Sequence, residues 1–282
     1  MIPATFLRAK PAQSARVGIL GVPFESSSTF GTGTKFAPYY IRIAGENTVE
    51  YSNLQGINLL TEEVSDWGNV DVLHGNFEGT REEMLSDLEK MKEAGVKQFF
   101  IIGGEHSISP AVIEWLKPKR IAVIDAHLDF EEEWNGIKHS HACAVRRMAE
   151  IVGYDRIVVL GARSFSEAEK FEAEELGLRY YTSLEIREDP HILSRELAKA
   201  DYLSVDLDGF DPSFAPEVGN PEPFGLDPTD FLLALRSAKI RNADLVEAAP
   251  SSATTPTASL ALVLSREIIA RMLKVETDPA NH

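Results

Sequence analysis

The stretch Ile121-Ala-Val-Ile-Asp125-Ala-His127-Leu-Asp129 decides how this chain folds, because an apolar run ends directly in three side chains of types that can ligate metal ions. Further along, Tyr202-Leu-Ser-Val-Asp206-Leu-Asp208 repeats the pattern. In an extended backbone, residues two apart point to the same side. If the two runs form neighbouring strands, their ends aim four carboxylates and one imidazole at a single small volume.

So many carboxylates in one place would repel one another and would lose hydration at a large cost. Divalent cations remove that cost, and we therefore predict a binuclear metal centre. A third segment, Gly103-Gly-Glu-His106, follows another apolar run and supplies a second imidazole. Single aspartates at such turns are usually strand-end caps or ion-pair partners, but three matched segments favour metal ligands. The candidate ligands are His106, Asp125, His127, Asp129, Asp206 and Asp208.

The chemistry of these ligands indicates the metal. Four carboxylates cancel the charge of two divalent ions, and bridging carboxylates hold such ions roughly 3.5–4 Å apart. An oxygen-rich set with two imidazoles and no thiolate favours Mn²⁺, and Co²⁺, Fe²⁺ and Zn²⁺ are also compatible. We expect two Mn²⁺ ions per chain. We expect Cys143, the single cysteine, to be a small buried side chain and not a ligand.

Composition narrows the range of partners. The 282 residues include 28 Lys+Arg against 44 Asp+Glu, which gives a formal net charge of −16. A nucleic-acid partner would call for a basic patch, so we expect none. The negative charge favours a small cationic ligand through electrostatic steering, and it serves solubility equally well.

The sequence predicts a soluble cytoplasmic protein without a membrane partner. One cysteine permits no intrachain disulfide, which is typical of a reducing compartment. The opening residues, MIPATFLRAKPAQSAR, lack the apolar core of a signal peptide. No apolar run approaches the roughly 20 residues that are needed to span a bilayer.

Short apolar runs alternate with helical patterns along the whole sequence, which predicts one α/β domain over residues 1–282. We expect a central, mostly parallel sheet of about eight strands. The predicted strands are residues 16–22, 59–64, 98–102, 120–124, 156–160, 179–182, 202–205 and 244–247. The predicted helices are one that starts at a capping box of Thr80 and Glu83, and residues 141–152, 166–177, 190–200, 228–238 and 257–273.

The residues with chemical potential all follow predicted strands. His106 follows the run FFII, Asp125 follows IAVI, Asp206 follows YLSV and Glu247 follows DLV. Ligands of open parallel sheets bind at the carboxyl ends of the strands. We therefore expect all four side chains at one edge of the sheet.

The chain resembles the ureohydrolases, the family that includes arginase and agmatinase. Segments spread over nearly the whole sequence match family motifs: residues 103–107 (GG(D/E)HS), 125–129 (DAHxD), 204–212 (SxDxDxxDP), 215–222 (APGxGxPE), and 21–24 with 31–42 (the opening segment). The resemblance implies a three-layer αβα sandwich, the arginase/deacetylase-like fold, with two Mn²⁺ ions. It also implies hydrolysis of a guanidino group to urea and an amine.

The resemblance also assigns roles by position. It implies one ion on His106 and Asp129, the other on His127 and Asp208, and bridging carboxylates at Asp125 and Asp206. Glu247, in the segment DLVEAAP, matches the glutamate that hydrogen-bonds the guanidinium, with a surface carboxylate as the alternative. His141 matches the histidine that protonates the leaving amine, with a locally packed histidine as the alternative. Asp129 would orient the attacking hydroxide.

Two departures from the family pattern concern the substrate pocket. The HGT of many members is His141-Ala-Cys143 here, which loses a hydroxyl group. The P-x-Y-D segment that often follows the glutamate is Pro250-Ser-Ser-Ala253, which lacks the aspartate and alters a wall of the pocket. Neither change removes a presumed ligand. For His139, two residues before His141, we expect a structural or mouth-lining role.

The loop of residues 130–135 bears on the substrate, because it contains Glu131, Glu132, Glu133 and Trp134. Acidic groups beside an aromatic ring suit a substrate that carries an ammonium group at the end opposite its guanidinium, through charge and cation–π contact. They would repel the α-carboxylate of arginine. A solvated acidic loop is an equally good interpretation. Together with the Arg-Arg pair after His141, which resembles the agmatinase branch, this predicts hydrolysis of agmatine to putrescine and urea in polyamine biosynthesis.

Other activities stay open at this point. Within the class they are the hydrolysis of arginine, aminopropylagmatine, guanidino acids or formiminoglutamate. From other classes they are a catalytically silent relative that binds a polyamine, and metal-dependent deacylation, which usually needs one ion. Family members are commonly trimers or hexamers, so the resemblance implies a homo-oligomer.

Overall fold

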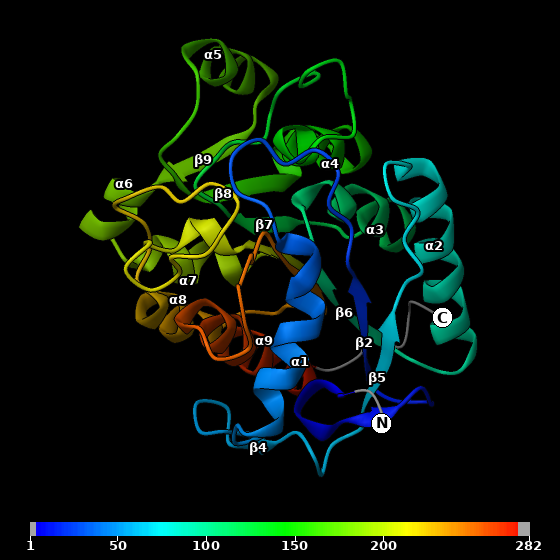
Figure 1. Cartoon of the computed structure of the whole chain (residues 1–282). Helices are drawn as coiled ribbons and strands as arrows, with labels where there is room; N and C mark the ends of the chain where they lie inside the picture. Colours follow the sequence, from blue (N-terminus) through cyan, green and yellow to red (C-terminus); the bar gives the residue numbers. More distant parts are fainter. Residues whose placement is uncertain (1–3, 276–282) are drawn as a thin grey trace.

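The computed structural model describes residues 4–275 and shows a central sheet with helices on both sides (Figure 1). Within these residues the main sheet has nine strands in the order β1-β5-β2-β6-β11-β10-β7-β8-β9, and every neighbouring pair is parallel. The strands are β1 Lys10–Pro11, β2 Val17–Val22, β5 Val64–Asn69, β6 Gln98–Gly103, β7 Ile121–Ile124, β8 Ile157–Ala162, β9 Arg179–Thr182, β10 Tyr202–Asp206 and β11 Asn242–Val246. The expected α/β fold with a mostly parallel sheet is confirmed.

Nine α-helices are found within residues 4–275, together with a small antiparallel pair, β3 Tyr51–Ser52 and β4 Ile57–Asn58. The helices are α1 Ala37–Glu46, α2 Phe77–Glu93, α3 Ser109–Leu116, α4 Ala144–Val152, α5 Glu167–Leu176, α6 Ser183–Glu188, α7 His191–Leu197, α8 Pro228–Leu235 and α9 Pro256–Lys274. Among these residues, no helix combines the length and apolarity that crossing a membrane requires.

Two hydrophobic cores lie on opposite faces of the sheet. Successive strand residues face opposite ways, and in β6 Phe100 and Ile102 join one core while Phe99 and Ile101 join the other. The first core contains side chains of α1, α7, α8 and α9, and the second contains side chains of α2, α3 and α4. Figure 1 shows α1 crossing one face of the sheet. This arrangement is the expected αβα sandwich.

The order of the central strands creates the place for a site. Although β7 follows β6 in the sequence, β11 and β10 lie between them in the sheet. The chain leaves β7 toward β8 on one side and leaves β10 toward β11 on the other, so the connections diverge between β10 and β7. Parallel sheets leave a crevice for ligands at such a point. The carboxyl ends of β6, β11, β10 and β7 meet at this crevice.

The predicted strand at residues 59–64 is wrong, because the strand β5 begins where that prediction ends. Before it, the backbone turns, and the N–H of Thr61 donates to the carbonyl of Asn58 at 3.1 Å. The strand β5 has no apolar pattern that would reveal it in the sequence, because two of its buried residues are polar: Ser65 is 0% exposed and Asp66 is 3% exposed.

The predicted start of a helix at Thr80 is also wrong. Asn76 caps α2, and its side chain accepts the backbone N–H of Gly79 at 3.0 Å. Thr80 lies inside the helix, where its hydroxyl donates to the carbonyl of Asn76 at 3.0 Å. The Thr80–Glu83 spacing is therefore a coincidence within the helix.

Candidate metal centre

Six side chains from three strand ends converge in two groups that could each hold a metal ion. One group contains His106, Asp125, Asp129 and Asp206, the other contains Asp125, His127 and Asp208, and the ligand atoms of each group lie within 4.8 Å of one another. These are the six residues that the sequence nominated. Asp125 belongs to both groups, and Asp206 belongs to the first.

The distances within the two groups are short. Nδ1 of His106 lies 2.9 Å from Oδ2 of Asp129, 3.3 Å from Oδ2 of Asp125 and 3.4 Å from Oδ2 of Asp206. Nδ1 of His127 lies 3.0 Å from Oδ2 of Asp208. Nitrogen and carboxylate oxygen atoms therefore point at common centres.

In Asp125, Asp206 and Asp208, one carboxylate oxygen accepts a backbone N–H and the other faces an imidazole. The N–H of His127 donates to Oδ1 of Asp125 at 2.7 Å, and the N–H of Asp208 donates to Oδ1 of Asp206 at 2.9 Å. Oδ1 of Asp208 accepts the N–H of Ala126 at 3.1 Å. The spacing of two residues thus serves twice, because it aligns the side chains and supplies the N–H groups that fix them.

A buried chain of hydroxyl groups fixes the tautomer of His106. Nε2 of His106 lies 3.1 Å from the hydroxyl of Ser204, which donates to Asp244 at 2.5 Å. Tyr202 donates to the other oxygen of Asp244 at 2.6 Å. Because the single Ser204 proton goes to Asp244, Ser204 accepts from Nε2–H. Nδ1 of His106 therefore carries the lone pair, which a metal ligand requires.

Two buried atoms at the centre of the first group have no hydrogen-bond partner, namely Nδ1 of His106 and Oδ2 of Asp125. Both residues are 0% exposed. Buried polar atoms of this kind are rare and costly unless something else satisfies them. A divalent cation between a lone pair and a carboxylate oxygen fits both atoms, so the residues present suit a metal centre.

The pKa values of the group show that it demands positive charge. Burial would lower the pKa of His106, but the carboxylates of Asp125, Asp129 and Asp206 outweigh burial and raise it well above its ordinary value. Burial and then the charge of Asp125 raise the pKa of Asp129 to about 7. Burial and then Asp208 raise the pKa of Asp206 as well. Divalent ions would supply this charge in place of protons.

Two residues at the site adopt the left-handed backbone conformation that residues other than glycine rarely adopt, Asp129 with φ 47° and Glu247 with φ 60°. The N–H of Glu247 donates to the carbonyl of Gly104 at 2.8 Å, and the carbonyl of Asp129 accepts the N–H of Arg146 at 3.2 Å. Such strain persists where surrounding contacts enforce it, and it concentrates at functional sites.

The two groups open into a cavity of about 300 Å³. Its wall includes His127, Asp129, Asp206 and Asp208 from the metal groups. It also includes the three residues that the sequence nominated for substrate and catalysis, which are His141, Glu247 and Trp134. Glu247 is 6% exposed, so the surface-carboxylate interpretation does not describe it.

The sequence matches the arginase family model over residues 15–270. The chain belongs to the arginase family. An N(1)-aminopropylagmatine ureohydrolase of Thermococcus kodakarensis is 31% identical over 268 residues, which cover 93% of this chain and 92% of that protein. An agmatinase of Pyrococcus horikoshii is 30% identical over 81% of this chain and 82% of its own length. The predicted ureohydrolase resemblance is thereby confirmed.

Solved structures of the arginase family share this fold. The crystal structure of the agmatine ureohydrolase of Thermoplasma volcanium superposes with a TM-score of 0.88 at 30% identity, covering 97% of this chain and 95% of that one. The superposition therefore extends over nearly all of the chain.

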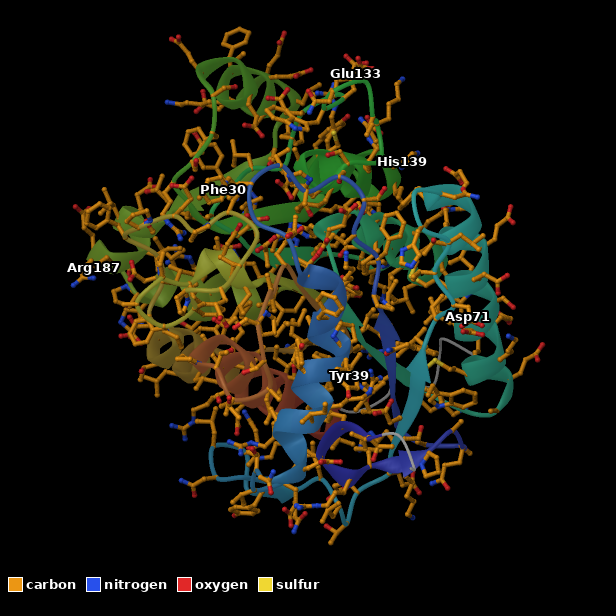
Figure 2. All side chains as sticks on the ribbon, in the orientation of Figure 1. Phe30, Tyr39, Asp71, Glu133, His139 and Arg187 are labelled. Atoms are coloured by element: carbon orange, nitrogen blue, oxygen red, sulfur yellow. The ribbon has the colours of Figure 1, made fainter. Side chains whose placement is uncertain are left out.

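The acidic loop divides between the cavity and its rim. Glu131 lines the cavity, whereas Glu132 and Glu133 are exposed and are not part of its wall. Figure 2 shows Glu133 and His139 on the outer loop at the top of the view. His139 stacks on Phe77 with a ring distance of 4.8 Å, which is a structural contact. Cys143 is 0% exposed, so its predicted burial is confirmed.

Three residues at the site escaped the sequence analysis. Glu169 lines the cavity, although its Ser166-x-x-Glu169 spacing indicates only a helix cap. Glu105 stood inside a quoted motif without a role. Arg163 donates to the carbonyls of Asp208 and Glu222 at 2.7 and 2.8 Å and so ties β8 to the loops after β10. No sequence pattern indicated Arg163, because its partners are backbone carbonyl groups, and every residue has one whatever its side chain.

Proposed function

We propose that the chain hydrolyses the guanidino group of agmatine to urea and putrescine at a centre of two Mn²⁺ ions. One observation carries the choice of substrate. Besides the candidate metal ligands, the described part of the cavity wall carries three carboxylates, Glu131, Glu169 and Glu247. It contains no lysine or arginine among the described residues. Such a wall attracts a dication with a charge at each end and repels the α-carboxylate of arginine.

Glu247 is the residue for the guanidinium end. Its Oε1 accepts the backbone N–H of His106 at 2.7 Å, which places the carboxylate beside the ligand groups. A planar guanidinium pairs with a carboxylate through parallel hydrogen bonds, and this pairing would set its carbon over the metal groups. Burial raises the pKa of Glu247 well above its ordinary value, and an arriving cation would keep the carboxylate ionised.

The distal end of the substrate would lie against Glu131, Glu169 and Trp134. Glu169 is anchored, because its Oε1 accepts the N–H of Phe130 at 2.8 Å. Burial raises the pKa of Glu169, which means that its negative charge is poorly stabilised when no cation is bound. A bound ammonium group would stabilise that charge. Trp134 sits at the tight turn that Asn135 and Gly136 form with positive φ values, and its indole offers a face to the ammonium.

His106, Asp125, His127, Asp129, Asp206 and Asp208 would hold the two ions. When bound, such a pair lowers the pKa of a water molecule that it shares and so supplies a nucleophile near neutral pH. Asp129, which lines the cavity, would orient that nucleophile toward the guanidinium carbon. As the bond from this carbon to the alkyl nitrogen breaks, His141 would donate a proton to the departing nitrogen. Water is consumed, and urea and a protonated amine are formed.

A urea-release assay with Mn²⁺-loaded protein tests the proposal. The panel contains agmatine, aminopropylagmatine, arginine and a guanidino acid, and formiminoglutamate is tested by the release of formamide, because its hydrolysis forms no urea. Agmatine should give the highest kcat/KM, and arginine should give little product. Absence of urea from every guanidino compound would refute the class. In that case elemental analysis identifies a silent relative, which would contain no metal, whereas the enzyme should contain about two ions per chain.

Aminopropylagmatine is the second candidate substrate. It carries a further ammonium group, and the acidic loop continues beyond the cavity with the exposed Glu132 and Glu133 (Figure 2). The variant E132Q/E133Q distinguishes the two substrates. Its KM should rise for aminopropylagmatine and stay unchanged for agmatine if the outer carboxylates meet the longer ligand.

We further propose that the protein acts in the cytoplasm as a homo-oligomer, a trimer or a hexamer. The single cysteine supports the compartment, and the resemblance to the ureohydrolases supports the assembly. Large apolar side chains at the surface also suit an interface, since Phe30 is 80% exposed and Phe224 is 79% exposed. Light scattering on the purified chain would test the assembly, and a monomer would contradict it.

A further inference from the structure

A line of hydrogen-bonding groups leads from the His141 ring to a buried carboxylate. Nδ1 of His141 lies 3.0 Å from the hydroxyl oxygen of Ser27, and that hydroxyl donates to Oε1 of Glu105 at 3.0 Å. Ser27 comes from the loop between β2 and α1, Glu105 follows β6, and His141 precedes α4. The proposed catalysis so far gives no role to Ser27 or Glu105.

Backbone packing fixes the position of Glu105. Its N–H donates to the carbonyl of Phe24 at 2.9 Å, and a Cβ on the preceding Gly104 would lie 2.0 Å from that same oxygen. Only glycine permits so close an approach. The N–H groups of Ser26 and Ser27 then donate to Oε2 of Glu105 at 2.7 and 2.8 Å. Glu105 is 1% exposed, so water does not replace these contacts.

The donors around Glu105 determine where the protons lie. Besides these two N–H groups and the Ser27 hydroxyl, Ser107 donates to Oε1 at 2.6 Å. A carboxylate that is surrounded by donors in this way acts only as an acceptor. The single hydroxyl proton of Ser27 therefore goes to Glu105. Toward the ring, the Ser27 oxygen can therefore only accept, which favours the neutral form of His141 that carries its proton on Nδ1.

The backbone of His141 is held by the same hydroxyl. Its N–H donates to the Ser27 oxygen at 3.0 Å, and the Ser140 hydroxyl lies 3.3 Å from Nδ1. The Nδ1 edge is thus engaged on the protein side, while the residue lines the cavity. Nε2 is the nitrogen that remains for the substrate.

We propose that Ser27, backed by Glu105, is a positioning residue that holds His141 in the Nδ1–H tautomer with Nε2 available to the cavity. The inference rests on the proposed function of His141 as the proton donor. After His141 takes up a proton on Nε2, that N–H bond breaks as the departing nitrogen gains its proton. The electron pair stays on Nε2, and the ring returns to the Nδ1–H form without a change of partner.

The charged groups around His141 act in both directions. Burial lowers the pKa of the ring, the charge of Glu105 raises it, the two histidines of the metal groups lower it, and Asp208 raises it. Through Ser27 the ring meets the carboxylate by hydrogen bonds and not by charge alone. Loss of the hydroxyl should therefore lower the pKa of His141 further, because the protonated ring loses an acceptor.

Nitrogen NMR of the imidazole side chains tests the inference in the full chain loaded with Zn²⁺, a diamagnetic ion. The H141N variant identifies the His141 signal among the seven histidines. The parent should show protonation on Nδ1 in the neutral ring. S27A should shift the tautomer toward Nε2–H and lower the pKa of His141 by roughly half a unit to one unit. S27T, which keeps the hydroxyl, should behave as the parent.

The matched control is S26A. Ser26 is exposed and gives Glu105 only its backbone N–H, so this variant should change neither the tautomer nor the pKa. In the urea assay, S27A should lower kcat for agmatine and leave KM unchanged. If S27A does not fold, the isosteric pair S27T and S27V provides the same comparison.

An Nε2–H tautomer in the parent overturns the inference, and so does an S27A or S27V variant with the parent's tautomer and pKa. These readings require no turnover. If the protein releases no urea and yet shows the Nδ1–H tautomer lost in S27A, the positioning role stands and the proposed function fails.

Discussion

Replacement of Glu247 by glutamine tests how the site recognises a cation. The substitution keeps the size of the side chain and the acceptor that the N–H of His106 uses at 2.7 Å. It removes the negative charge and places an amide donor where the substrate also presents donors. We therefore expect E247Q to retain its fold and its ions and to lose its hold on the guanidinium.

The magnitude follows from the burial of the carboxylate, which is 6% exposed. Removing one partner of a buried ion pair costs about 3–5 kcal/mol. Since about 1.36 kcal/mol corresponds to a factor of ten in rate, kcat/KM for agmatine should fall by roughly 10²–10⁴-fold. The metal-free protein should respond in the opposite way. Burial raises the pKa of Glu247 well above its ordinary value, so removal of its charge should raise the melting temperature of the metal-free chain.

The assay combines urea release, elemental analysis and thermal melting with and without a chelator. E83Q, which changes an exposed glutamate on α2, is the matched control and should leave all three measurements unchanged. A loss in kcat/KM smaller than tenfold would show that Glu247 does not bind the guanidinium. Loss of the ions would show that Glu247 belongs to the metal groups.

Three further predictions concern separate parts of the molecule. H141N should lower kcat in the urea assay while elemental analysis finds the ions intact, and loss of ions would refute the role of His141. D66N should lower the free energy of unfolding in urea by about 3–5 kcal/mol, because it leaves Arg42, paired with Asp66 at 2.8 Å, as an uncompensated buried cation; an unchanged midpoint would contradict this. Burial raises the pKa of Glu169, so the folded chain binds the carboxyl proton more tightly than the unfolded chain does. The free energy of unfolding therefore falls as the pH rises from the ordinary pKa of the glutamate to its raised pKa. E169Q should therefore gain melting temperature relative to the parent across that window, and a constant difference between the two would show that Glu169 does not titrate there.

Much of the sheet could be predicted from the sequence, because runs such as those of β6 and β7 are apolar throughout and are buried on both faces. Helices α1 and α3 could not. Both are short and have proline in the first turn. The buried residues of α1 recur at helical spacing, but its other face carries Tyr39 and Ile43 and no polar stripe, whereas α3 buries residues 109–113 in succession. In α1, Gly45 also breaks the helical pattern. It is needed there because an added Cβ would lie 3.0 Å from the backbone nitrogen of Leu7.

The ligand groups could be predicted because their geometry is local. A spacing of two residues at a strand end fixes both the direction of the carboxylates and the N–H groups that hold them, as in Asp125 and His127. The supporting residues could not be found in this way. Ser27 and Glu105 are 78 residues apart and meet only because β2 and β6 are neighbours in the sheet. Sequence reasoning thus finds residues that act through local spacing and misses those that act through strand order.

The features of the chain that destabilise its fold are concentrated in the crevice at the strand ends. The crevice combines buried carboxylates, unpartnered ligand atoms and a left-handed backbone at Asp129 and Glu247. Each feature destabilises the fold locally. Contacts with other elements enforce these features. The N–H of Glu247 donates to the carbonyl of Gly104, the N–H of Arg146 on α4 donates to the carbonyl of Asp129, and Nε2 of His106 lies against the hydroxyl of Ser204. Packing in the two cores of the sandwich therefore maintains a site whose own groups are unfavourable, and cations bound there would recover the free energy that the site costs.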